Sequence, residues 1–225
     1  MHKAMTVTFA VILAAATAGL AVAGKDREKM PDPQTDFQAY TAYQLRKHFP
    51  NIELTNQDGK KLRFYDDLIR GKIVVIQFMF TDCTRLCPMV TPNLVKVQQE
   101  LEKEAPGEVN FVSISVDPDH DKAEVLKAYA MKFHVGPRWQ FLTGRKSDVE
   151  RLRRELGVLD PEETTYEHMN VVTIGREPTG RWFCMRALTR PDAIAYNVLR
   201  LTNHTTGTAG GKPASATQVR LTAGR

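Results

Sequence analysis

The stretch that decides the fold reads Ile73-Val74-Val75-Ile76-Gln77-Phe78-Met79-Phe80-Thr81-Asp82-Cys83-Thr84-Arg85-Leu86-Cys87-Pro88. Its first eight residues are almost all apolar, which is the pattern of a strand that is buried on both faces of a sheet. Apolar residues then recur at helical spacing, at Val90, Leu94, Val97 and Leu101. The stretch therefore predicts a buried strand that delivers two cysteines to the start of a helix.

The rest of the chain alternates in the same way between apolar strands and amphipathic helices. Further strands are expected at residues 109–116, 140–143, 169–174 and 181–187, and helices at 125–133, 147–156 and 190–201. Ser147-Asp148-Val149-Glu150 has the form of a capping box, and a weak hairpin at 52–64 precedes the central strand. This order predicts an α/β fold with a mixed central sheet flanked by helices, in which the last two strands add an antiparallel edge.

The two ends of the chain differ from this pattern. Residues 1–23 combine an early cation, an apolar run and small residues, so we expect a secretory signal peptide or, alternatively, an N-terminal anchor at residues 5–23. Residues 24–47 are expected to form a linker, 48–201 the folded domain and 202–225 a disordered tail. The domain is therefore expected to be exported, most plausibly to a periplasm, either soluble or tethered to the inner membrane.

The charge of the chain excludes one class of function. The formal net charge is +5, but Lys3 lies in the signal segment and the tail adds Lys212, Arg220 and Arg225 without any acid, which leaves about +1 for the core. A near-neutral core lacks the electrostatic footprint of a nucleic-acid-binding protein.

Cys83 and Cys87 form the natural pair among the three cysteines. At positions i and i+4 on a first helical turn, two thiols share one face and lie within range of a disulfide. The helix N-terminus favours the thiolate, which increases both nucleophilicity and metal affinity. Metal binding and disulfide chemistry both remain open at this point.

A metal at this pair needs further ligands. Structural zinc takes four protein ligands, usually from two closely spaced pairs, and the chain has no second cysteine pair. Two thiolates and one imidazole form a soft set that suits copper. Among the six histidines, His168 is the best candidate because it follows an acidic loop and directly precedes a predicted strand; the alternative is an ordinary loop histidine.

Four motifs in order resemble the Sco/SenC family of thioredoxin-fold copper proteins, over roughly residues 52–201. They are residues 80–88 and then Ser115-Val116-Asp117-Pro118-Asp119-His120-Asp121, Phe141-Leu142-Thr143-Gly144 and Glu167-His168. Thr84 stands where the family usually has proline, a change that affects the stiffness of the loop more than its ligands.

The resemblance implies a thioredoxin-like fold and a copper metallochaperone. Such a protein would deliver copper to the binuclear copper centre of cytochrome c oxidase, or maintain the thiols of that centre. The ligands of the family fall on Cys83, Cys87 and His168, and its acidic partner-contact loop falls on Asp117 and Asp121. The partner would be the copper-bearing oxidase subunit or another periplasmic copper protein.

Two enzymatic readings compete with this one. In a thiol–disulfide oxidoreductase, Cys83 and Cys87 would be a catalytic redox dithiol, although thioredoxins space their cysteines by only two residues. Thr84-Arg85-Leu86-Cys87 also fits a peroxiredoxin site, but Phe80 stands where that site needs proline. Cys184, between two apolar residues of a predicted strand, is expected to be a buried structural cysteine.

Overall fold

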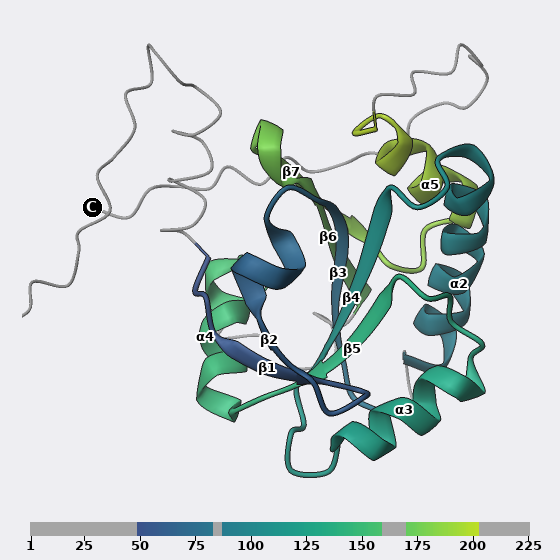
Figure 1. The fold of residues 1–225 in the computed structure, drawn as a ribbon. Helices are drawn as coiled ribbons and strands as arrows, with labels where there is room; N and C mark the ends of the chain where they lie inside the picture. The colour runs from purple at the N-terminus through teal and green to yellow at the C-terminus, as the bar shows by residue number, and fades with distance from the viewer. Residues whose placement is uncertain (1–48, 83–86, 159–169, 203–225) are drawn as a thin grey trace, which may run out of the picture. The chain divides into compact units, whose positions relative to one another are not determined.

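The computed structural model describes residues 49–82, 87–158 and 170–202, except for the side chain of Cys87 (Figure 1). All of these residues belong to a single compact unit. The expected signal segment, the whole of the expected linker and all of the expected tail except Thr202 lie outside them. Within the described ranges, no helix is both long enough and apolar enough to cross a membrane.

A seven-stranded mixed sheet forms the centre of the fold, in the order β2-β1-β5-β4-β3-β6-β7. The three central strands β5, β4 and β3 are parallel, and every other pairing is antiparallel. The strands are β1 (Glu53–Asn56), β2 (Lys61–Arg63), β3 (Ile73–Met79), β4 (Val109–Ser115), β5 (Trp139–Thr143), β6 (Val171–Arg176) and β7 (Arg181–Arg186).

Helices cover both faces of this sheet. One face packs against α2 (Cys87–Glu104), α3 (Ala123–Lys132) and α5 (Pro191–Leu199), and the other against the π-helix η1 (Phe64–Ile69) and α4 (Lys146–Glu155). Figure 1 shows α2 and α5 together on one side of the strands and α4 on the other. The expected α/β class, with helices on both faces of a mixed sheet, is confirmed.

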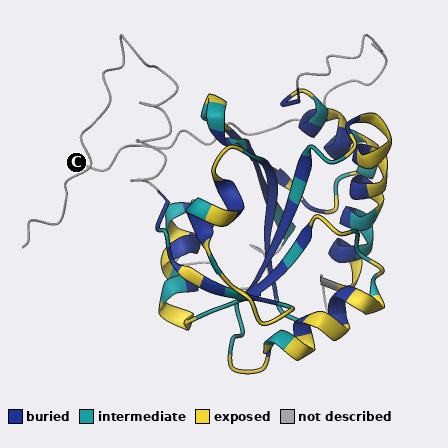
Figure 2. Ribbon diagram, in the orientation of Figure 1, coloured by how far each residue is buried: buried dark blue, intermediate teal, exposed yellow. Residues whose placement is uncertain are grey.

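The burial of β3 explains why six of its seven residues are apolar. All seven of its residues are buried (Figure 2). Ile73, Val75 and Met79 belong to the core under α2, α3 and α5, whereas Val74, Ile76 and Phe78 belong to the core under η1 and α4. Because side chains alternate across a strand, a continuous apolar run is what burial on two faces requires.

The local details differ from the sequence prediction at two places. No side-chain cap is present at α4, whose N-cap residue is Arg145, and Ser147 already lies inside the helix; the predicted capping box is therefore wrong. The return strand of the N-terminal hairpin ends at Arg63, and η1 follows directly. This short helix was not predicted, because Phe64, Tyr65, Leu68 and Ile69 of η1 are buried by tertiary packing.

Glu177 connects η1 to the β6–β7 turn. Its side chain is 2% exposed. One carboxylate oxygen accepts a hydrogen bond from the Tyr65 hydroxyl at 2.7 Å, and the other accepts one from the Gly71 backbone N–H at 2.8 Å. The Glu177 N–H in turn donates to the Lys72 carbonyl at 3.0 Å. This single residue therefore fixes the segment that leads into β3.

We predict that Glu177→Ala destabilises the fold by about 1–3 kcal/mol, because it removes the carboxylate that accepts hydrogen bonds from the buried Tyr65 hydroxyl and from the Gly71 backbone N–H. Urea unfolding followed by circular dichroism measures the change. Glu53→Ala is the matched control, since it removes a carboxylate whose ion pair with Lys61 is exposed to solvent and contributes little to stability. Equal losses in the two variants would contradict this role for Glu177.

Candidate metal site

The two cysteines follow the carboxyl end of β3. The strand ends at Met79, and Thr81 and Asp82 form a turn. Cys83 lies outside the described residues, and Cys87 is the first residue of α2. The predicted order of buried strand, cysteine segment and helix is confirmed, whereas the expected place of Cys83 on a helical first turn stays a prediction.

His168 also lies outside the described residues. The strand that follows it in the sequence, β6, lies beside β3 in the sheet. β6 pairs antiparallel with β3, and Gln77 lies opposite Val172. His168 is therefore four residues before the partner of Gln77, while Cys83 is six residues after Gln77. Because the strands are antiparallel, the chain enters β6 at the same edge of the sheet at which it leaves β3.

The donor set at this edge fits a soft metal ion. Thiolates and imidazole suit copper, with sulfur favouring Cu(I). Among the described residues, no three His, Cys, Asp or Glu side chains gather in a way that could hold a metal. Cys83, Cys87 and His168 stay the predicted ligands; in the sequence, β3 ends four residues before Cys83 and β6 begins three residues after His168.

Asp121 holds the start of the cysteine segment. It is 1% exposed, and its carboxylate accepts a hydrogen bond from the Thr81 backbone N–H at 3.1 Å. The hydroxyls of Thr81 and Ser115 also donate to it. Thr81 lies two residues before Cys83, so this buried carboxylate fixes the point at which the chain leaves the sheet toward the thiols.

The acidic loop between β4 and α3 divides into a buried and an exposed part. The carboxylate of Asp121 points into the fold, and Asp121 therefore does not offer the surface contact that was expected of it. Asp117 is partly exposed and pairs with the Nδ1 atom of the exposed His120 at 2.8 Å. Contact with a partner protein stays a prediction for Asp117 alone.

Sequence reasoning missed Thr81 and Ser115 as functional positions. They lie in two of the quoted motifs, at residues 80–88 and 115–121, and the structure joins these motifs through Asp121. The Ser115 hydroxyl also accepts the Asp117 backbone N–H at 3.0 Å. The recurrence of two polar motifs, each after a buried strand, was the available signal, but their contact depends on the parallel pairing of β3 and β4.

A buried cation packs beside the same strand. Arg153 of α4 is 6% exposed, and its guanidinium lies 6.0 Å from the centre of the Phe78 ring. Its Nε and Nη2 atoms have no hydrogen-bond partner among the described residues. Desolvation lowers the pKa of Arg153. Phe78 is five residues before Cys83, so a positive charge lies on the α4 side of the strand that leads to the thiols.

Cys184 lies on β7 away from this edge. It is partly buried and is a free thiol, and it lies 3.5 Å from the Thr173 hydroxyl. Burial raises the pKa of the Cys184 thiol, which disfavours the thiolate and hence reactivity. Cys184 is therefore only partly buried, where a buried residue was expected, and its structural role stays a prediction.

Comparisons with known proteins identify the family of this chain. The family model described as SCO1/SenC matches residues 40–199. A SCO1 protein homologue of Bacillus subtilis is 35% identical over 97 residues, which are 42% of this chain and 49% of the relative. The chain thus spans about half the length of the curated relatives that it matches.

Solved structures share the fold. The structure of BsSco, described as a member of the Sco family of cytochrome c oxidase assembly proteins with a disulfide switch, has a TM-score of 0.54 and 26% identity, covering 67% of this chain and 90% of BsSco. Arabidopsis thaliana ScoI, solved with copper bound, has a TM-score of 0.56 and 22% identity over 68% of this chain and 96% of ScoI. The thioredoxin-like fold is thereby confirmed.

The family model covers well over half of the chain, and its bounds contain β1 through α5 together with both cysteines of the pair and His168. This chain belongs to the SCO1/SenC family.

Proposed function

We propose that this protein binds copper through Cys83, Cys87 and His168 and acts as a copper metallochaperone. Its target would be the binuclear copper centre of cytochrome c oxidase, to which it delivers copper or whose thiols it maintains. Its partner is the copper-bearing oxidase subunit or another periplasmic copper protein. The metal is cargo in this scheme, received at the sheet edge and passed on to the partner.

The antiparallel pairing of β3 with β6 is the observation that carries the proposal. It puts the end of β3 and the start of β6 at the same edge of the sheet. Cys83 follows the first and His168 precedes the second, although the two are about 80 residues apart in sequence. If β6 ran parallel to β3, His168 would enter the sheet at the opposite end, and the three donors could not meet. The observed direction is the one that a shared site requires.

The residues of the chain have separate roles at this site. The two thiolates supply most of the affinity for a soft ion, and the imidazole completes a low coordination number from the β6 side. Asp121 and Thr81 hold the exit of β3 in place. A rigid support of this kind fixes the point from which the segment that carries the two cysteines starts.

A second function has one specific observation in its favour. The solved relative BsSco is described as having a disulfide switch, and two cysteines four apart can close a disulfide. We therefore keep a thiol–disulfide oxidoreductase as the alternative. In that case the dithiol carries two electrons to a partner disulfide, Cys83 and Cys87 become the new disulfide, and His168 has no direct part.

Residues 1–23 support an exported location. An early cation, an apolar run and small residues near position 23 fit a signal peptide or an anchor. We propose that the domain from residue 48 to 201 is exported to the periplasm, with 24–47 as a linker from the membrane and 202–225 as a tail. Copper delivery to an oxidase at the membrane requires such a location.

The first prediction concerns the ligand set. Loading the reduced protein with one equivalent of copper should give thiolate-to-copper absorption. Cys83→Ala, Cys87→Ala and His168→Ala should each lower the copper affinity by more than about 100-fold, since loss of a mere outer-shell partner already costs 10–100-fold. Competition with a chromophoric chelator measures the affinity. Cys184→Ser is the matched control and should bind like the wild type; unchanged affinity in all three ligand variants would place the site elsewhere.

The second prediction separates the chaperone from the oxidoreductase. His168→Ala should abolish copper binding yet leave the rate of disulfide reduction within about twofold, because the imidazole is a ligand and not part of the dithiol. The rate is followed by the loss of a disulfide in a model protein substrate under anaerobic conditions. If His168→Ala binds copper like the wild type and also reduces the disulfide at the wild-type rate, the enzymatic alternative is favoured.

The third prediction tests the support provided by Asp121. Asp121→Asn keeps the shape of the side chain but places an amide N–H₂ among donors, and should cost about 1–3 kcal/mol of folding free energy. At a temperature where the variant is still folded, its copper affinity should fall by about tenfold or more. The exposed neighbour Asp119 supplies the control, Asp119→Asn, which should change neither property. Normal copper affinity in folded Asp121→Asn would show that the carboxylate is structural only.

A further inference from the structure

A polar pocket lies near the amino ends of the parallel strands, at the end of the sheet opposite to the one that the cysteines follow. Its volume is about 270 Å³. Lys72, Asn110 and Arg138 line it and lie at or just before the first residues of the parallel strands β3, β4 and β5. The cysteines follow the opposite, carboxyl end of β3, which is seven residues long and therefore spans about 23 Å. The pocket is thus separate from the candidate copper site.

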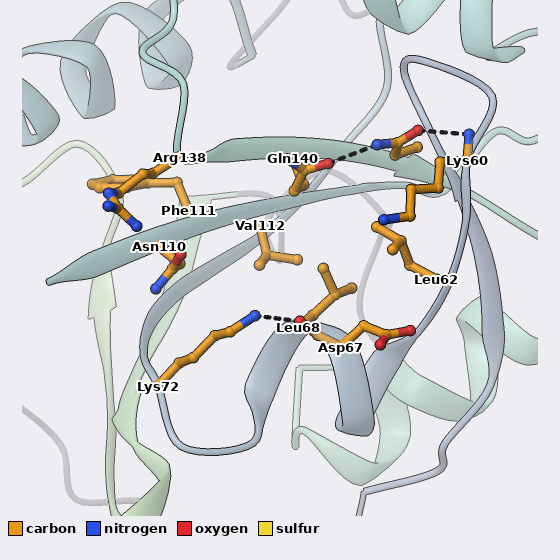
Figure 3. Close-up of a pocket in the computed structure, with 11 residues that line it drawn as sticks. Lys60, Leu62, Asp67, Leu68, Lys72, Asn110, Phe111, Val112, Arg138 and Gln140 are labelled. Atoms are coloured by element: carbon orange, nitrogen blue, oxygen red, sulfur yellow. Dashed lines mark hydrogen bonds between the residues drawn. The ribbon is translucent and has the colours of Figure 1, made fainter. Parts of the chain in front are cut away.

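Cations dominate this pocket. Lys60, Lys72 and Arg138 line it, against Asp67 as the one acid among its lining residues. The Asp67 carboxylate already accepts the Arg63 backbone N–H at 2.7 Å. Figure 3 shows Lys60 approaching from the hairpin side and Lys72 from the strand below it. An excess of two positive charges in one pocket of a near-neutral domain calls for an anionic occupant.

The cations are not used by ion pairs in the part of the chain that the structure describes. The neighbouring Lys61 pairs with Glu53 at 2.7 Å and Lys127 with Asp58 at 3.1 Å, whereas no such pair involves Lys60 or Arg138. Lys72 is partly buried, and its ammonium donates to the backbone carbonyl of Asp67. Desolvation lowers the pKa of Lys72, and an anion nearby would offset that loss of solvation.

Side-chain amides add neutral donors to the cations. Asn56 donates through Nδ2 to the Gln140 Oε1 atom at 2.8 Å, and its own Oδ1 accepts the Lys60 backbone N–H at 2.8 Å (Figure 3). This network fixes the start of the Lys60 side chain. Because Gln140 accepts through Oε1, its N–H₂ group is left as a donor beside the pocket.

The volume of the pocket and its apolar lining residues limit the size and polarity of the ligand. Pockets for drug-sized ligands hold about 300–1,000 Å³, and this one is smaller at about 270 Å³. Apolar side chains of Leu62, Leu68 and Val112 also line it. The excess of two positive charges among the lining residues suits a small ion with two negative charges, with or without a short carbon chain.

We propose that this pocket binds a small dianion, either a phosphate group or a short dicarboxylate. Lys60, Lys72 and Arg138 bind the charged oxygens, and the Gln140 amide donates a neutral hydrogen bond. Charge-assisted hydrogen bonds of this kind are the strong ones, and guanidinium suits a planar or tetrahedral oxyanion. The site would be independent of copper.

The test is a calorimetric titration of the metal-free full chain at fixed ionic strength, with inorganic phosphate in one arm and succinate in the other. Saturable one-to-one binding of either probe supports the proposal and identifies the class of anion. The backbone amide resonances of residues 72, 110 and 140 should shift with the same binding constant. If neither probe binds saturably, the proposal is overturned.

Variants of exposed residues assign the binding to this pocket without disturbing the core. Lys60→Gln and Arg138→Gln should each weaken binding by about tenfold, the scale of one lost charge-assisted hydrogen bond. Lys61→Gln makes the same change of charge on the neighbouring residue, outside the pocket, and should bind like the wild type. Equal weakening in all three would mean general charge attraction and would overturn the proposal. Copper affinity should be unchanged in each, which keeps this test separate from that of the copper site.

Discussion

The rest of the structure depends on the position of β3 between β4 and β6. Its backbone pairs in parallel with β4 over the full seven residues and antiparallel with β6 over five. Both of its faces are covered, so every side chain must be accommodated inside the protein. Even Gln77, the one polar residue of the strand, is buried, and its amide donates to the Ser113 hydroxyl at 2.7 Å. A strand held on four sides has a fixed end, and the cysteine segment begins at that end.

Asp121 holds the chain in one position where it leaves β3, through its hydrogen bond from the Thr81 backbone N–H. A buried carboxylate is costly unless several donors satisfy it, and here the donors come from β4 and from the residues after β3. The same contact that stabilises the fold therefore determines where the thiols start. This explains physically why two motifs that are more than 30 residues apart belong together: one supplies the acid, and the other supplies Thr81.

The two ends of the parallel strands lie near different kinds of side chain. Soft donors follow the carboxyl end of β3, whereas lysine, arginine and amide side chains gather at the amino ends of β3, β4 and β5. The region between them is apolar on both faces. The seven residues of β3, which span about 23 Å, separate the start of the strand from the end that the cysteine segment follows. The near-neutral net charge of the domain conceals this local excess of cations.

The sequence by itself determined the elements that have a strong local pattern. The buried strand β3 and the helix that begins at Cys87 follow from apolar periodicity. The ligand types could also be chosen from sequence, since the preference of thiolate and imidazole for copper does not depend on the fold. The starts of helices were harder to predict. The sequence pattern indicated a cap at Ser147, but α4 begins one residue earlier, at Lys146, without a side-chain cap.

Only the tertiary structure decided which distant segments meet. The choice of β3 as the partner of β6, the pairing of β1 with β5 and the contact between Asp121 and Thr81 all join residues that are 40 or more positions apart. The pocket of Lys60, Lys72 and Arg138 has no sequence pattern at all, because its residues come from a hairpin, a strand entry and a loop. Local sequence encodes the period and chemistry of each element, but the packing of the whole chain determines which side chains share a site.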